Sequence, residues 1–232
     1  MKIGILAAGS NEAALLAQYG SFAQMTERML SHTAFRFQTW NVYLGEFPDS
    51  ADQCDGWIIT GSPASVYESL PWIRPLEQLI RDIDRLKQPL VGICFGHQII
   101  AQALGGTVEK AAVGWGLGIG HYQPTGVTET PFGRDDLYLH IIHQDQVISL
   151  PEGAEVLAGS VFCPNAILSY GCSIFTVQAH PEFGVDYMQD LLAAITPEYI
   201  TQEEAEQAIA SLSEQRASAE RVVENIVSVL SA

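Results

Sequence analysis

Gly92-Ile93-Cys94-Phe95-Gly96-His97-Gln98 is the stretch of sequence that decides the fold and places its most reactive side chain. An apolar run over residues 89–93 leads into it and is typical of a buried parallel strand. Residues 97–104 follow with the composition of a helix and end at Gly105-Gly106, a common helix terminus. The sequence therefore predicts a strand, a sharp turn at the cysteine, and a helix.

Cys94 stands between two glycines in this turn. A Gly-x-Cys-x-Gly pattern favours a tight strand-to-helix junction that exposes one side chain above the edge of a sheet. A thiol at that place faces a helix N-terminus, whose free N–H groups and dipole favour the thiolate. We therefore interpret Cys94 as a nucleophile. The alternative is an inert buried cysteine, because cysteine often serves as a small hydrophobic residue.

Composition and charge indicate a globular protein and exclude some classes of partner. The chain has 232 residues, 47% of them hydrophobic and 16% charged, which is typical of a globular protein with a substantial core. Its net charge of −16 argues against nucleic acid and acidic membranes as partners. Four cysteines without close pairing favour a reduced compartment, and residues 3–8 fit a first strand better than a secretory signal. We expect a cytoplasmic protein.

Strand and helix patterns alternate through the first half of the chain. Strands are expected near residues 3–8, 35–42, 57–60 and 89–93, and helices near residues 11–32, 71–87 and 97–104. This order predicts an α/β fold with a mostly parallel central sheet and helices on both faces, a flavodoxin-like arrangement of three layers.

The second half changes to short strands and turns. Strands expected near residues 107–109, 119–123, 137–142, 155–158 and 166–170 would add antiparallel strands at one side of the sheet. Residues 174–179 would form the last central strand, and helices are expected over residues 184–195 and 201–230. We expect one domain over residues 1–196 and a helical extension over residues 197–232 that packs on the same domain.

A partner for the thiol is expected at the end of that last strand. His180 follows the strand directly, so it should lie at the carboxyl edge of the sheet, where ligands of open α/β sheets bind. Glu182 lies two residues further on, past Pro181, and residues i and i+2 of an extended chain point to the same side. Cys94, His180 and Glu182 could thus form a catalytic triad. The alternative is an ordinary turn at a strand end.

These motifs resemble those of a known family. Gly92 to Gln98, followed much later by Gln178-Ala179-His180-Pro181-Glu182, resembles the class I glutamine amidotransferases, and the resemblance covers roughly residues 50–185. It includes the turn Thr60-Gly61-Ser62-Pro63. His143-Gln144-Asp145-Gln146-Val147 is similar to a segment of the amidotransferase domain of GMP synthetases.

The resemblance implies a chemistry for the triad. Cys94 would attack the side-chain amide of glutamine or the γ-carbonyl of a γ-glutamyl compound. His180 would protonate the departing nitrogen and later activate water, while Glu182 would hold the imidazole. The backbone N–H groups of Gly61 and Phe95 would form the oxyanion hole.

The same resemblance implies a site for the glutamyl group. Gln98 would help to seat it, and the backbone of Gln144 and Asp145 would hold its α-amino group. Gln144 replaces a glycine that is common in the family, so the shape of this part of the pocket is expected to differ.

No cofactor and no metal are expected. The alternating glycines of residues 114–120 lack a Gly-x-Gly-x-x-Gly register, and no Walker loop occurs. His140, His143, Cys163 and Cys172 lack the paired close spacing of zinc ligands.

Three functions are compatible with these expectations. The protein could be a stand-alone hydrolase of glutamine or γ-glutamyl amides, or a glutaminase subunit that supplies ammonia to a separate synthetase or acceptor partner. It could also be a regulatory protein that retains the fold without catalysis. The C-terminal helices could cover an ammonia exit or form the face of a homodimer.

Overall fold

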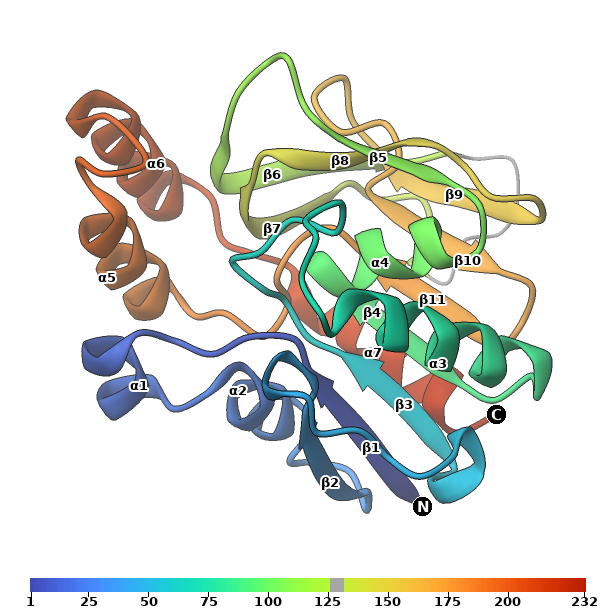
Figure 1. Cartoon of the computed structure of the whole chain (residues 1–232). Helices are drawn as coiled ribbons and strands as arrows, with labels where there is room; N and C mark the ends of the chain where they lie inside the picture. Colours follow the sequence, from blue (N-terminus) through green and yellow to red (C-terminus); the bar gives the residue numbers. More distant parts are fainter. Residues whose placement is uncertain (126–131) are drawn as a thin grey trace.

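One central sheet organises residues 1–125 and 132–232, the part of the chain that the computed structural model describes (Figure 1). Within these residues the strands follow the order β2-β1-β3-β4-β11-β10-β9-β6-β7. Their bounds are β1 Lys2–Ala7, β2 Arg36–Asn41, β3 Gly56–Ile59, β4 Leu90–Ile93, β6 Gly116–Pro124, β7 Leu137–His143, β9 Ala154–Gly159, β10 Ile167–Tyr170 and β11 Ile174–Val177.

Parallel strands occupy one half of this sheet and antiparallel strands the other. β1 pairs with β2 and β3, and β4 pairs with β3 and β11, all in parallel. β10, β9, β6 and β7 continue the sheet by antiparallel pairing. The predicted α/β class, with extra antiparallel strands at one side, is confirmed.

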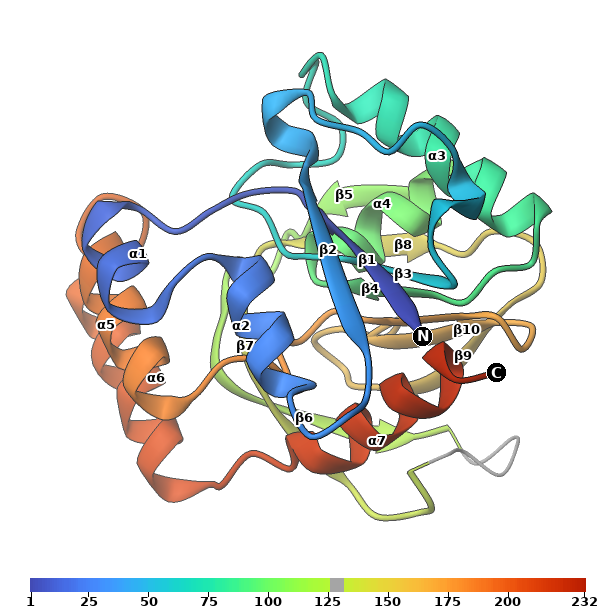
Figure 2. The same cartoon turned by 90° about the horizontal axis from the view of Figure 1, so that it is seen from below.

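Helices cover both faces of the parallel half (Figure 2). α3 (Ile73–Arg85) and α4 (Phe95–Ala103) lie on one face, and α2 (Phe22–Met29) and α7 (Ala219–Leu230) lie on the other. Side chains of a strand point alternately to its two faces. Accordingly, Trp57 and Ile59 of β3 belong to the first core and Ile58 to the second, and all three are fully buried. The three-layer arrangement is thus also confirmed.

Two helices, rather than the single helix expected over residues 201–230, end the chain. After α5 (Val185–Ile195), α6 spans Gln202–Glu214 and α7 follows after a break. At the break, Ser218 N–H donates to the carbonyl of Tyr138 at 2.6 Å, and Tyr138 N–H donates to Ser218 Oγ at 2.9 Å. These bonds to β7 compete with helical ones. The expectation of one helix was therefore wrong, because tertiary partners take the backbone groups.

The two helices lie in different places. α6 packs against α5 and β6, and α7 packs against β4, β7 and β11. α7 thereby becomes one of the layers over the parallel half of the sheet. The domain boundary between residues 196 and 197 stays a prediction.

The remaining elements are α1, a small second sheet and two short 3-10 turns. α1 (Ala13–Tyr19) is separated from α2 at Gly20 and Ser21, and Ser21 caps α2 in a capping box with Gln24. A small sheet of β5 (Thr107–Lys110) and β8 (Asp145–Ser149) lies against α4, and β8 was not predicted as a strand. Short 3-10 turns span Val42–Leu44 and Ala51–Gln53.

Among the described helices, none combines the length and the apolar composition that crossing a bilayer would require.

Candidate active site

Cys94 occupies the turn between β4 and α4 with φ of 51° and ψ of −102°. A positive φ is uncommon for any residue with a Cβ, and such strain is concentrated at functional sites. The flanking glycines have a different purpose from the one expected. A Cβ on Gly92 would lie 2.6 Å from the backbone of Gly96, and one on Gly96 would lie 2.3 Å from Ile59 O. The glycines therefore let α4 approach β3 and β4, while the unusual dihedral angles fall on the cysteine itself.

The close approach of Gly96 to β3 leads to a stability prediction. We expect Gly96→Ala to lower the free energy of unfolding by about 1–3 kcal/mol or more, because an overpacked core must shift backbone. Urea unfolding followed by circular dichroism measures this loss. Gly184→Ala is the control, since a Cβ there meets nothing within 4 Å. The control should cost at most about 1 kcal/mol, the price of alanine at a helix N-cap, and equal losses in both variants would contradict the packing argument.

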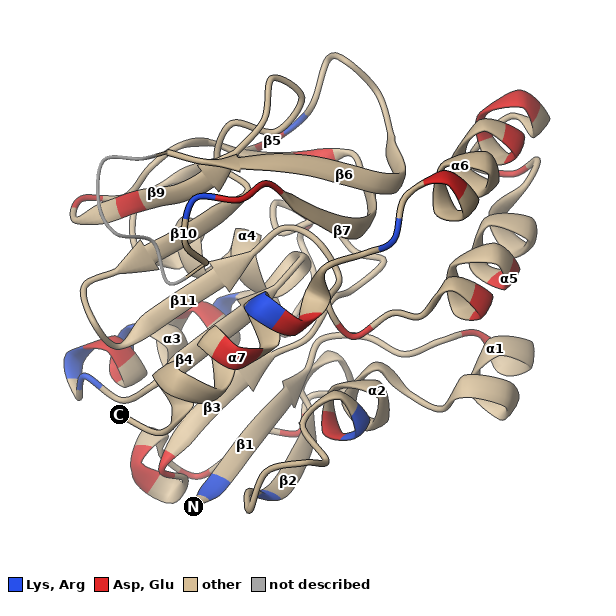
Figure 3. Cartoon of the chain, turned by 180° about the vertical axis from the view of Figure 1, so that it is seen from behind, with Lys and Arg blue, Asp and Glu red and all other residues tan. Residues whose placement is uncertain are grey.

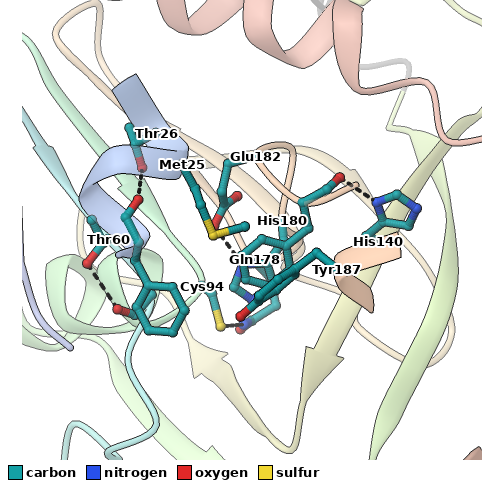
Figure 4. Close-up of polar contacts among 12 residues, drawn as sticks. Met25, Thr26, Thr60, Cys94, His140, Gln178, His180, Glu182 and Tyr187 are labelled. Atoms are coloured by element: carbon teal, nitrogen blue, oxygen red, sulfur yellow. Dashed lines mark hydrogen bonds and ion pairs between the residues drawn. The ribbon is translucent and has the colours of Figure 1, made fainter. Parts of the chain in front are cut away.

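His180 and Glu182 meet Cys94 at the carboxyl edge of the sheet (Figure 4). His180 Nδ1 lies 2.8 Å from Glu182 Oε1, and their side chains are only 5% and 2% exposed. Cys94 is close enough to the His180 imidazole to affect its pKa. Gly61 borders both groups, since a Cβ on it would lie 3.1 Å from His180 Cε1 and 3.8 Å from Cys94 Cβ. These four residues come from the ends of β3, β4 and β11, which lie side by side.

Charge around His180 controls its protonation. Burial by itself lowers the pKa of the imidazole, but the charges and hydrogen bonds of Cys94 and Glu182 together outweigh burial and raise its pKa to about 10. Opposite charges in a site of low dielectric favour the charged form in this way. The imidazolium therefore persists through neutral pH as a proton donor beside the thiol.

The oxyanion hole predicted from the N–H groups of Gly61 and Phe95 stays a prediction, and the structure describes the backbone on which both groups lie. Phe95 is the first residue of α4, so its N–H has no partner within the helix. Gly61 follows β3, and Thr60 orients its peptide: Thr60 Oγ1 accepts from Ala8 N–H at 3.0 Å and donates to Gly61 O at 3.0 Å. Thr60 is fully buried. It acts as a positioning residue that sequence reasoning did not single out.

A chain of amides connects Cys94 to the segment predicted to hold the glutamyl group. Gln98 Nε2 donates to Asp145 O at 2.9 Å and to Gln178 Oε1 at 3.1 Å. Gln178 Nε2 in turn lies 3.6 Å from Cys94 Sγ. Gln178 was quoted for its motif but not predicted as a site residue. Its position two residues before His180 on an extended strand was the available signal, because such residues share a side.

Gln144 and Asp145 line the cavity that contains Cys94, and their carbonyls already have protein partners. Gln144 O accepts from Ala111 N–H at 2.9 Å, and His143 Nδ1 lies 3.2 Å from Asp145 O. The Asp145 carboxylate accepts from Tyr67 OH at 2.9 Å. The role of Gln144 and Asp145 in holding an α-amino group stays a prediction.

Two aromatic rings hold His180 in place. Phe183 stacks on the His180 ring with centroids 4.0 Å apart and planes at 6°. His140 Nδ1 lies 2.8 Å from Phe183 O, and His140 O accepts from His180 N–H at 2.8 Å. Burial is the main cause that lowers the pKa of His140, which keeps that ring neutral. Sequence reasoning missed both residues, because nothing local to His140 indicates that β7 lies next to β11's end.

A cavity of about 410 Å³ opens at this edge of the sheet. The predicted site residues that line it are Gly61, Cys94, Gln98, Gln144, Asp145 and His180. Phe95 and Glu182 are not part of the lining; Glu182 stands behind the imidazole that it contacts. Within the described residues, no three His, Cys, Asp or Glu side chains gather where they could hold a metal ion.

A strained cysteine, a histidine and a carboxylate at adjacent strand ends of an α/β fold are the groups that catalysis by a thiol nucleophile requires. The family model described as glutamine amidotransferase class-I matches residues 14–193. The chain belongs to the class I glutamine amidotransferase family, as its motifs predicted.

Relatives place the chain more closely. It is 31% identical to gamma-glutamyl peptidase 4 of Arabidopsis thaliana over 182 residues, which are 75% of this chain and 72% of the relative. It is 34% identical to a GMP synthase of Syntrophomonas wolfei over 149 residues, 60% of this chain and 27% of the relative. The crystal structure of a Thermotoga maritima glutamine amidotransferase has a TM-score of 0.76 at 22% identity, covering 98% of this chain and 96% of that one.

Proposed function

We propose that this protein is a thiol hydrolase that cleaves the γ-amide of glutamine or of a γ-glutamyl compound through a cysteinyl acyl-enzyme. The observation that carries the proposal is the gathering of Cys94 and the hydrogen-bonded pair of His180 and Glu182 around Gly61. Membership of the amidotransferase family supports amide cleavage. The likeness to a gamma-glutamyl peptidase supports the γ-glutamyl carbonyl as its target.

Acylation begins with the thiolate of Cys94. Its sulfur forms a bond to the γ-carbonyl carbon, and the π electrons of the carbonyl move onto oxygen. The N–H groups of Gly61 and Phe95 donate to that oxyanion, an interaction worth about 3–4 kcal/mol for each donor. The C–N bond then breaks, and the imidazolium of His180 gives its proton to the departing nitrogen. Ammonia or an amine leaves, and a γ-glutamyl thioester remains on Cys94.

Deacylation uses the same groups in the reverse sense. Neutral His180 takes a proton from water while the water oxygen bonds to the thioester carbon. The C–S bond breaks, the thiolate returns beside the imidazolium, and glutamate leaves. Glu182 accepts a hydrogen bond from Nδ1–H throughout, which keeps the opposite ring nitrogen directed at Cys94.

A second candidate function is a glutaminase subunit that feeds ammonia to a separate synthetase. The likeness to GMP synthase favours it, because the matched region is only 27% of that relative. A regulatory protein without catalysis is the third reading, and the intact triad geometry counts against it. A cytoplasmic location stays a prediction.

A panel of glutamine and γ-glutamyl amides separates these readings. We expect the purified chain to release ammonia or amine from at least one member, measured by a coupled ammonia assay and by mass spectrometry of the amine. Turnover that requires an added synthetase would favour the subunit reading. If every member is inert both with and without a synthetase, the hydrolase proposal is overturned.

A further inference from the structure

The cavity extends well beyond the atoms that glutamine hydrolysis requires. Beyond His180 its wall continues along α5, where Tyr187, Leu191 and Ile195 line it at intervals of four residues. Residues four apart share one face of a helix. Eight residues of helix rise ~12 Å. This wall is therefore several bond lengths longer than the space that ammonia would occupy as the leaving group. A substrate larger than glutamine could therefore lie against it.

The triad geometry orients the substrate in the cavity. The amides of Gln98 and Gln178 lie on one side of Cys94 and lead to Asp145, which is the proposed glutamyl side. His180 must reach the leaving nitrogen to protonate it. The substituent on that nitrogen therefore continues past His180, toward the Phe183 ring stacked on the imidazole. α5 begins two residues after Phe183, so its wall lies on the leaving-group side.

The opposite wall of this part of the cavity is also apolar and is firmly built. Leu15 of α1 and Phe22 of α2 line it. Tyr187 OH donates to Asn11 Oδ1 at 2.6 Å, and Tyr19 OH donates to Asp190 Oδ2 at 2.6 Å, which ties α1 to α5. Figure 1 shows α1, α5 and α6 gathered at one end of the molecule. The slot between α1 and α5 is thus bounded by aromatic and aliphatic side chains.

Negative charge surrounds the outer end of this slot. Glu12 and Glu198 line the cavity there, and the pKa of the Tyr199 hydroxyl is raised chiefly by its hydrogen bond to Glu198, with the charge of Glu12 contributing. α5 and α6 carry Asp and Glu but no Lys or Arg (Figure 3). Lys110, the one Lys or Arg among the described lining residues, lines the cavity beside Gln144 and Asp145, the proposed glutamyl side. A carboxylate on the leaving amine would therefore be repelled.

We propose that the slot between α1 and α5 is a subsite for the leaving amine and that it takes an aromatic or branched apolar amine without a carboxylate. The subsite is built from the Phe183, Tyr187, Leu191 and Ile195 side chains on one wall and Leu15 and Phe22 on the other. This inference rests on the proposed hydrolase function. It names the substrate class as γ-glutamyl amides of apolar amines, rather than glutamine.

Three substrates and one pair of variants test the subsite. The substrates are γ-glutamyl phenethylamide, γ-glutamyl phenylalanine, which differs from it by one carboxylate, and glutamine. Ala194 lines the cavity and is exposed, so Ala194→Trp would fill the slot without disturbing a core. Ala193, its exposed neighbour, does not line the cavity, and Ala193→Trp is the matched control.

For the wild-type chain we expect kcat/KM for the phenethylamide to exceed that for glutamine by at least about tenfold, the scale on which apolar pockets discriminate. γ-Glutamyl phenylalanine should be cleaved more slowly than the phenethylamide, and the difference should shrink in high salt. Ala194→Trp should lower the phenethylamide-to-glutamine ratio at least about tenfold, and Ala193→Trp should leave it unchanged. Labelling of Cys94 by an electrophilic glutamine analogue reports that each variant is folded.

Two results would overturn the subsite while leaving the hydrolase proposal intact. One is Cys94-dependent cleavage of glutamine with no preference for the phenethylamide. The other is an Ala194→Trp variant with the wild-type ratio. Faster cleavage of γ-glutamyl phenylalanine than of the phenethylamide would overturn the exclusion of carboxylates. Absence of Cys94-dependent turnover of all three substrates would overturn the hydrolase proposal itself.

Discussion

Cys94→Ala is expected to lower γ-glutamyl amide cleavage by at least ~10⁴-fold, because removal of a nucleophile leaves only binding and the oxyanion site to act on the substrate. The acyl-enzyme should also disappear from the mass spectrum of the protein trapped during turnover. Substrate binding should be retained in this variant. The hydrogen bonds from Gln98 to Asp145 O and to Gln178 do not involve the Cys94 sulfur. Steady-state kinetics and intact-protein mass spectrometry measure the two losses.

An electrophilic glutamine analogue should label Cys94 alone among the four cysteines. Burial raises the pKa of Cys54, and burial together with the neighbouring charge of Cys94 raises the pKa of Cys163 to about 12, so both thiols stay protonated. Cys172 is exposed but does not line the cavity. Cys172→Ala should therefore retain full activity and labelling. An adduct on any other cysteine with Cys94 unmodified would contradict the assignment of the nucleophile.

Glu182→Gln is expected to lower kcat by ~10²–10⁴-fold and to change the pH profile at its alkaline end. The pKa of His180 is raised to about 10, so the imidazolium is present below that pH and is lost as the pH rises through it. The alkaline limb of kcat/KM should fall near this value in the wild-type chain. Glutamine at position 182 keeps a hydrogen-bond acceptor but removes the charge. The pKa of His180 should then fall, and the limb should move to lower pH.

Asp186→Asn is the matched control, because it removes a carboxylate from the first turn of α5 that is exposed and does not line the cavity. Its pH profile should coincide with that of the wild-type chain within experimental error. An alkaline limb that stays in place in Glu182→Gln would show that His180 does not carry the proton in question. Equal shifts in both variants would mean that the overall negative charge of the protein, rather than the contact between Glu182 and His180, determines the pH of the alkaline limb.

Local patterns were sufficient for most of the fold and for the order of the reactive groups. The apolar runs of β1, β3 and β4 indicated a parallel sheet. Strands that are buried on both faces have continuous apolar sequences, without alternation of polar and apolar residues. The residues around Cys94 and His180 also followed from local rules, since a side chain directly after a parallel strand must lie at the carboxyl edge. Glu182 followed from the two-residue period of extended chain.

Long-range contacts decided what local patterns could not. The break between α6 and α7 depends on hydrogen bonds between Ser218 and Tyr138, which are 80 residues apart. β8 is a strand because β5 pairs with it, and its own residues show only a weak alternation. The contribution of Gly92 and Gly96 is clear only from the packing of α4 against β3 and β4. A glycine in the sequence does not show which part of the backbone will approach it in the fold.

The sequence by itself determined that a cysteine, a histidine and a glutamate stand at the ends of parallel strands, because strand periodicity and turn chemistry are local properties. Only the tertiary structure decided that β4 lies between β3 and β11, which brings Gly61 and His180 to Cys94. It also decided that α1 and α5 enclose a slot beyond the imidazole, since that wall joins segments more than 170 residues apart. Packing between distant segments follows from complementary surfaces, which no single stretch of sequence contains.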